Sequence, residues 1–110
     1  RYRVLLICDN AHGAYLNFLP KNRHPIHLGA DICCDSAHKT LPALTGAGYL
    51  HISKNAPPII QKNAEKAMSL FASTSPSYLI LQSLDKANAY LEGYGEKLKA
   101  YSNLSGAYQS

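Results

Sequence analysis

Two short, mostly apolar runs limit the folds that this chain can adopt. Residues 3–8 read RVLLIC and residues 30–35 read ADICCD, and each run has the length of one strand. Continuous apolar runs of this length favour strands that are buried on both faces, as in a parallel sheet covered by helices. Residues 49–53, YLHIS, are rich in strand-forming residues and predict a third strand. The segments between these strands carry several glycines and prolines and are predicted to be loops, with room for one short helical turn in the first of them.

The second half of the chain has the periodicity of helices. Residues 56–72 carry two prolines near their start, at Pro57 and Pro58, which the first turn of a helix tolerates. Their apolar residues then fall on one face, at Ile60, Ala64, Ala67, Met68 and Phe71. After a break at residues 73–78, in which Ser75 before Pro76 is a start signal, apolar residues recur from Ile80 to Tyr101. This recurrence predicts one long amphipathic helix, weakened by Gly93 and Gly95.

The predicted order is therefore strands and loops over residues 1–53 and two helical segments over residues 54–110. Strands that are apolar on both faces need cover on both faces, and two helices supply only part of that cover. The chain also begins without an initiator methionine. We therefore expect an α/β fold in which these 110 residues are a piece of a larger layered domain.

Composition and charge exclude several classes of protein. No apolar run approaches the roughly 20 residues of a membrane span, so no membrane association is expected. The net charge is +4, but the basic residues are scattered, so we expect no nucleic-acid binding. Three cysteines, two of them adjacent, do not make a disulfide framework and indicate the cytoplasm. The histidines and cysteines lack zinc-site spacing, so no metal is expected.

Polar side chains follow the first two predicted strands. Asp9 closes the first strand, and Ser36, His38 and Lys39 come directly after the second. If the two strands are parallel neighbours, these residues meet at the edge of the sheet where open α/β folds bind ligands. Pyridoxal 5'-phosphate needs a lysine for its aldehyde, a carboxylate for its ring nitrogen and polar groups for its phosphate. The alternative is that Asp9 caps a turn and Lys39 points into solvent.

Three strings of the sequence resemble one family. They are DNAHGAYL at residues 9–16, LGADICCDSAHKTLPALTGAGYLH at residues 28–51 and STSPSYLILQSLDKA at residues 73–87. Together they resemble the major domain of the Orn/Lys/Arg decarboxylases, which are pyridoxal-phosphate enzymes of the aspartate-aminotransferase fold. The string S-x-HKTLPALT followed by TSPSY is the most specific part. The resemblance implies a mostly parallel sheet flanked by helices.

The resemblance also implies a role for each site residue. Lys39 would form the Schiff base with the cofactor, and Asp9 would pair with its pyridine nitrogen. His12 would lie near the cofactor as a second candidate catalytic residue. The remaining implied cofactor contacts are Ala11 against the ring, Ser36 and His38 on the phosphate, and Ser73 or Thr74 on the phosphate of a neighbouring subunit.

The implied reaction is the α-decarboxylation of ornithine, lysine or arginine to the corresponding amine. The family implies a homodimer or higher oligomer with shared sites. Its enzymes are several times longer than this chain, so we expect the 110 residues to hold part of the site and to be inactive alone. Two alternatives stay open. One is an aminotransferase or another lyase of the same fold, and the other is a non-catalytic assembly segment.

Overall fold

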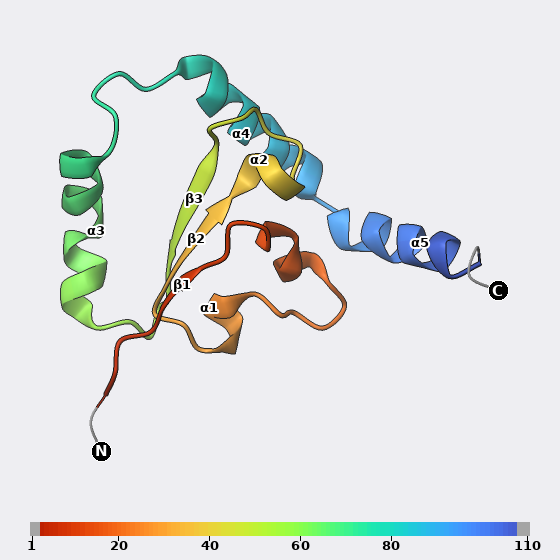
Figure 1. The fold of residues 1–110 in the computed structure, drawn as a ribbon, viewed down its shortest axis with the longest axis horizontal. Helices are drawn as coiled ribbons and strands as arrows, with labels where there is room; N and C mark the ends of the chain where they lie inside the picture. The colour runs from red at the N-terminus through yellow and green to blue at the C-terminus, as the bar shows by residue number, and fades with distance from the viewer. Residues whose placement is uncertain (1–2, 108–110) are drawn as a thin grey trace.

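A three-stranded sheet lies at the centre of the computed structural model, which describes residues 3–107 (Figure 1). Its strands are β1 (Ile7–Asp9), β2 (Ile32–Ser36) and β3 (Gly48–Ile52), in that order across the sheet. β1 and β2 are parallel, as predicted, but β3 runs antiparallel to β2. A parallel crossover needs a connection of about a dozen residues or more, and residues 37–47 are too few to make one. The expectation of a mostly parallel sheet is therefore wrong for this pair.

Short helices occupy the connections that the sequence predicted as loops. The segment between β1 and β2 contains the 3-10 helix η1 (Ala14–Phe18) and α1 (Pro25–Leu28). α1 has proline at its first turn and ends at Gly29, whose φ of 113° few residues other than glycine adopt. α2 (Ala37–Thr40) follows β2 without a gap. A single helical turn therefore carries His38 and Lys39, whereas Ser36 is the last residue of β2.

The last part of the chain forms three helices rather than two. They are α3 (Pro58–Phe71), α4 (Tyr78–Leu91) and α5 (Tyr94–Ala107). The expected single helix from residue 80 to 101 is broken at Gly93, which has a φ of 71°. That left-handed conformation cannot continue a right-handed helix, and glycine adopts it without steric cost. α4 is capped by Ser77, whose hydroxyl accepts from the Ile80 N–H, and not by the predicted Ser75.

The two faces of the sheet are covered by different elements. Successive side chains alternate between faces, so Cys33 and Asp35 lie on one face of β2 and Ile32 and Cys34 on the other. α3 faces the side of Ile32 across an apolar gap. The buried core lies at the end of the sheet where β2 ends and β3 begins. Side chains from η1 and α4 pack against it, and its buried residues are Ala14, Ala37, Leu41 and Ala47.

The first predicted strand is shorter and more exposed than expected. Val4 and Leu6 precede β1 and are 81% and 55% exposed, and Ile7 within β1 is 61% exposed. The expectation of burial on both faces is wrong for these residues, because β1 lies at the edge of the described sheet and β2 is the described element that it chiefly contacts. In the described residues, no helix is both long enough and apolar enough to span a membrane.

Candidate cofactor site and a buried carboxylate network

The ends of β1 and β2 lie side by side, as the sequence predicted. The two strands are parallel, and Asp9 is opposite Cys34 in the register. The Asn10 N–H donates to the Cys34 carbonyl over 2.9 Å and extends this pairing by one bond. Ser36 ends β2 and α2 begins with the next residue, so Lys39 lies less than one helical turn beyond the strand.

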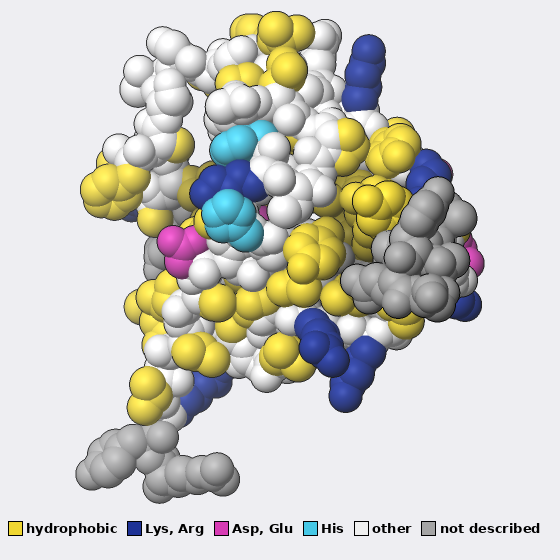
Figure 2. Space-filling view, turned by 45° about the vertical axis from the view of Figure 1, so that its right-hand side comes forward, with side chains coloured by type: hydrophobic (Ala, Val, Ile, Leu, Met, Phe, Trp, Pro, Cys, Tyr) yellow, Lys and Arg dark blue, Asp and Glu magenta, His cyan; other side chains and the backbone are white. Residues whose placement is uncertain are grey.

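Lys39 contacts the loop that follows β1. Its Nζ atom lies 3.5 Å from Nε2 of His12, and both side chains are exposed. Asp9 and His12 line one open cavity of about 490 Å³ together with Ala11. The Asp9 carboxylate is exposed and accepts a hydrogen bond of 3.2 Å from the Ala11 N–H. In the view of Figure 2, histidine side chains lie next to basic side chains, and an acidic side chain lies nearby.

The candidate phosphate ligands are placed in two separate regions. Ser36 is half-buried and lies at the N-cap position of α2. His38 donates from Nδ1 to the Ala47 carbonyl over 3.0 Å, which leaves Nε2 as the ring atom available for a phosphate once it is protonated. Ser73 and Thr74 are exposed on the connection between α3 and α4, which lies apart from the loop after β1 (Figure 1). Within this chain they are not brought to Lys39.

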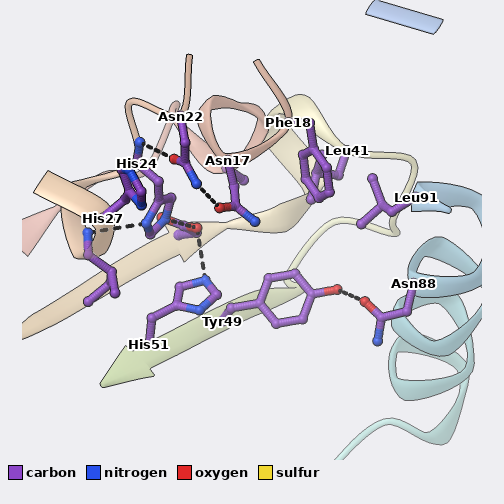
Figure 3. A pocket seen from close by; sticks show the side chains of 13 residues that line it. Asn17, Phe18, Asn22, His24, His27, Leu41, Tyr49, His51, Asn88 and Leu91 are labelled. Carbon is purple, nitrogen blue, oxygen red and sulfur yellow. Dashed lines mark hydrogen bonds and ion pairs between the residues drawn. The ribbon is translucent and has the colours of Figure 1, made fainter. Parts of the chain in front are cut away.

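A second polar group of residues lies on the opposite face of β2, around the buried carboxylate of Asp35. Asn10 donates to its Oδ1 atom over 2.8 Å, and the Cys33 thiol lies 3.5 Å from the same oxygen. The ring nitrogens Nε2 of His24 and His51 each lie 2.9 Å from Oδ2 (Figure 3). The side chains of Asp35 and His24 are only 3% and 5% exposed. Four donors therefore surround one buried carboxylate.

The hydrogen bonds define the protonation of this network. The Ile26 N–H donates to Nδ1 of His24, so Nε2 carries the proton that is donated to Asp35. Burial, together with the charge of Asp35, raises the pKa of the Cys33 thiol to about 12, so it stays protonated. Burial by itself would raise the pKa of Asp35, but the hydrogen bonds from Asn10 and His24 outweigh it and lower that pKa.

The network also has the donor atoms of a metal site. The ligand atoms of His24, Cys33 and Asp35 lie within 4.8 Å of one another, and all three residues are buried. A metal at Nε2 of His24 would need that nitrogen unprotonated, whereas the Ile26 N–H occupies Nδ1 and leaves the proton on Nε2. We interpret the cluster as a hydrogen-bond network, and the absence of a metal stays a prediction.

The sequence does not predict this network. Its pattern places Asp35 at the end of an apolar strand and indicates no site role for Asn10, His24 or His51. One signal is available, because a charged residue two positions after Cys33 shares its face in a strand. A buried carboxylate needs donors, and they come from segments 11 to 25 residues away in sequence.

Comparison with known proteins identifies the family. Residues 1–109 match the family described as Orn/Lys/Arg decarboxylase, major domain. The Bacillus subtilis protein named "Uncharacterized protein YaaO" is 39% identical over 101 residues, which cover 89% of this chain and 20% of that protein. An arginine decarboxylase of Halalkalibacterium halodurans is 33% identical over 101 residues, covering 89% of this chain and 20% of its own length.

A further relative, an arginine decarboxylase of Bacillus subtilis, is 32% identical over 100 residues, covering 88% of this chain and 20% of that protein. The chain thus spans about 20% of the length of these curated relatives. The family match covers almost all of the described fold, including both strand ends and the Lys39–His12 contact. This chain therefore belongs to the Orn/Lys/Arg decarboxylase family, as part of its major domain.

Proposed function

We propose that this chain is the cofactor-binding part of a pyridoxal 5'-phosphate-dependent decarboxylase that acts on a basic amino acid. The contact between Lys39 and His12 carries the proposal, because it joins the lysine after β2 to the loop that begins at Asp9. An amine and a carboxylate at one edge of a sheet meet the needs of the cofactor's aldehyde and ring nitrogen. Both segments also lie within the strings that resemble the family, at residues 9–16 and 28–51, and the one that carries Lys39 is the more specific.

The side chains at this edge fit the cofactor. Lys39 is exposed, and the Asp9 carboxylate has room to pair with a protonated ring nitrogen. The hydroxyl of Thr40, the next residue, is buried and has no hydrogen-bond partner among the described residues, so hydrogen-bonding capacity beside Lys39 is unfilled. We assign Ala11 to one face of the ring. We assign Ser36 and His38 to the phosphate, and Ser73 or Thr74 to the phosphate of a neighbouring subunit.

Each catalytic assignment follows from a property of the side chain. When bound, pyridoxal phosphate supplies an electron sink for the charge that is left on the α-carbon as carbon dioxide departs. Asp9 would keep the ring nitrogen protonated by holding a carboxylate against it. Lys39 would hold the cofactor through its amine. His12 lies close enough to Nζ of Lys39 to hold or move a proton there.

The substrate and the assembly follow from the family. Two of the relatives are named arginine decarboxylase, so arginine, lysine and ornithine are the substrates to test first. We propose a homodimer or higher oligomer in the cytoplasm. Because the chain spans about 20% of those relatives, we propose that residues 1–110 alone hold an incomplete site and are inactive.

Reductive labelling tests the proposed function. The full-length protein that contains this sequence is loaded with pyridoxal phosphate, reduced with borohydride and mapped by mass spectrometry. We expect the label on Lys39 and loss of the label in Lys39→Ala. The matched control is Lys54→Ala, which removes another exposed lysine and should leave the label unchanged.

The reaction is then assayed with ornithine, lysine and arginine, and release of carbon dioxide with the matching amine supports the proposal. Formation of a keto acid would instead favour an aminotransferase of the same fold. A protein that takes up no cofactor and carries no label would favour the non-catalytic assembly segment.

A further inference from the structure

The buried network around Asp35 joins the two segments that we assign to the cofactor. Asn10 is the residue between Asp9 and Ala11, and Asp35 is the residue before Ser36. The hydrogen bond of 2.8 Å between Asn10 Nδ2 and Asp35 Oδ1 links these segments across 25 positions of sequence. One interaction therefore connects the two chain segments whose spacing determines where Asp9 and Lys39 lie.

This link lies directly behind the proposed site. Asp9 is opposite Cys34, so it shares a face with Cys34 and Ser36. Asn10 and Asp35 are each one residue further along their strands and so lie on the opposite face. The Asn10 N–H also bonds to the Cys34 carbonyl over 2.9 Å, so both the backbone and the side chain of Asn10 are held by β2.

The local packing leaves Asn10 little freedom. The Gly13 N–H donates to the Asn10 carbonyl over 2.8 Å and closes the turn that carries His12. A Cβ atom at Gly13 would lie 1.9 Å from Oδ1 of Asn10, so the side chain packs directly on this glycine. On the other side, the histidines at positions 24 and 51 hold the second oxygen of Asp35. His24 is buried and bonds to the same oxygen as His51, so it still holds Oδ2 when His51 is replaced, and Oδ1 stays available to Asn10.

We propose that Asn10 and Asp35 are positioning residues, which set the distance between the carboxylate of Asp9 and the amine of Lys39. This inference rests on the proposed function. Neither residue touches the cofactor in this role, and each acts through the residue next to it. A group displaced by about 1 Å from its reactive geometry can lower a rate on the order of 100-fold. The pair is therefore expected to act on the rate through this distance, in addition to its part in the fold.

A swap of the two side chains tests the pair in the full-length protein. Asn10→Asp puts a second carboxylate against Asp35, and we expect kcat to fall on the order of 100-fold. The double variant Asn10→Asp with Asp35→Asn restores the hydrogen bond with its direction reversed, since the amide introduced at position 35 donates to the carboxylate introduced at position 10. We expect it to recover kcat to within about 5-fold of the wild type, as a preserved geometry requires.

His51→Phe is the matched control. It removes one donor from Asp35 and keeps a ring at a half-exposed position, while the bond between Asn10 and Asp35 remains. We expect a lower melting temperature with kcat within about 2-fold of the wild type, because the positioning pair is intact. If Asn10→Asp does not fold, Asn10→Ala removes the same bond without adding a charge and is compared with the swapped protein.

The outcomes separate this inference from the proposed function. Recovery in the swapped protein together with retained kcat in His51→Phe supports the positioning role. A swapped protein as slow as Asn10→Asp, or loss of kcat in His51→Phe in proportion to its melting temperature, overturns that role and leaves the proposed function standing. Wild-type protein without a label at Lys39 overturns the proposed function and, with it, the inference.

Discussion

The two faces of the sheet differ in how far the described residues complete them. On the face of Cys33 and Asp35, four side chains satisfy one carboxylate. On the face of Ile32 and Ile52, α3 lies across an apolar gap of about 480 Å³, and no residue of α3 is buried. The carboxylate of the polar face is therefore fully hydrogen-bonded within this chain, although a pocket of about 340 Å³ lies beside it, whereas the apolar face is only partly covered.

The difference shows what each kind of interaction requires. A buried carboxylate is costly unless donors with defined geometry surround it, so its hydrogen-bond partners have to be supplied by the fold itself. Apolar side chains gain free energy in proportion to the area removed from water, so an apolar face can be covered in part and by several elements in turn. The hydrogen-bond partners on the polar face are therefore supplied by this chain, and the apolar face has room for further apolar side chains to pack against it.

Replacement of Asp35 by leucine should have the largest effect on stability. The substitution leaves Asn10, His24 and His51 without their common acceptor, and His24 is buried. A buried donor that loses its acceptor typically costs about 1–3 kcal/mol, and more than one donor loses its acceptor here, so the loss should be at or above the upper end of that range. We expect a loss of this size in the free energy of unfolding, measured with urea and circular dichroism.

The comparison requires a matched change on the apolar face. Ile52 is half-buried beside the gap, so Ile52→Ala removes apolar area without leaving an unpaired polar group. We expect a loss of about 1 kcal/mol, well below the 2–5 kcal/mol that is typical of a fully buried isoleucine. Equal losses in Asp35→Leu and Ile52→Ala would contradict the contrast between the two faces.

The reactivities of two adjacent cysteines give a direct comparison of the two faces. Cys33 is fully buried against Asp35, and its pKa is raised to about 12 by burial and then by that charge, whereas Cys34 is exposed on the other face. Because the thiolate is the reactive form and Cys33 is buried, we expect iodoacetamide at about pH 8 to modify Cys34 much faster than Cys33. Peptide mapping at successive times measures both rates. Similar rates in the folded protein would show that the polar face is open to solvent.

The sequence predicted the parts of this structure that depend on local patterns. The apolar runs identified the strands, the helical period identified the face of α3 that meets the sheet, and the strand ends placed Asp9 and Lys39 at one edge. The sequence did not predict that Gly93 ends a helix. A glycine inside a helical pattern can either continue the helix or adopt a left-handed conformation, and the packing around it decides which of the two forms.

The network was beyond prediction for a different reason. The donors to Asp35 come from the loop after β1, the start of α1 and β3, and no local pattern states that these segments meet. Once the antiparallel register of β2 and β3 is known, His51 is opposite Cys33 and on the face of Asp35. A single sequence does not contain that register, so the partner of a buried charge appears only with the tertiary structure.

A methyl group at Gly13 should disturb the polar face by a smaller amount. The new Cβ of Gly13→Ala would lie 1.9 Å from Oδ1 of Asn10 and would displace the amide from Asp35. A buried acceptor that loses one of its partners typically costs about 1–3 kcal/mol. We expect a loss in this range in urea unfolding. Gly48→Ala is the matched control, since its Cβ would lie 3.1 Å from the Asp35 carbonyl, a milder contact, and it should cost less.

The smallest effect is expected in the acid dependence of stability. Burial opposes the charge of Asp35, but its hydrogen bonds outweigh burial and lower its pKa, so its contribution is complete above the ordinary aspartate pKa of about 3.9 and is lost as the pH falls below it. We expect the free energy of unfolding to decline less steeply in Asp35→Asn than in the wild type as the pH is lowered below about 4.

Part of the decline in the free energy of unfolding with falling pH should persist in Asp35→Asn. The hydrogen bond from the Leu6 N–H lowers the pKa of Asp31 despite the opposing effect of burial, and Arg3 adds to it, so Asp31 loses its own contribution over the same range of pH. Asp31→Asn should flatten the curve by a separate amount, and the double variant should combine both changes because the two carboxylates share no hydrogen-bond partner among the described residues. An unchanged slope in Asp35→Asn would mean that its carboxylate is no better stabilised in the fold than in water, and the polar face would then owe its closure to packing alone.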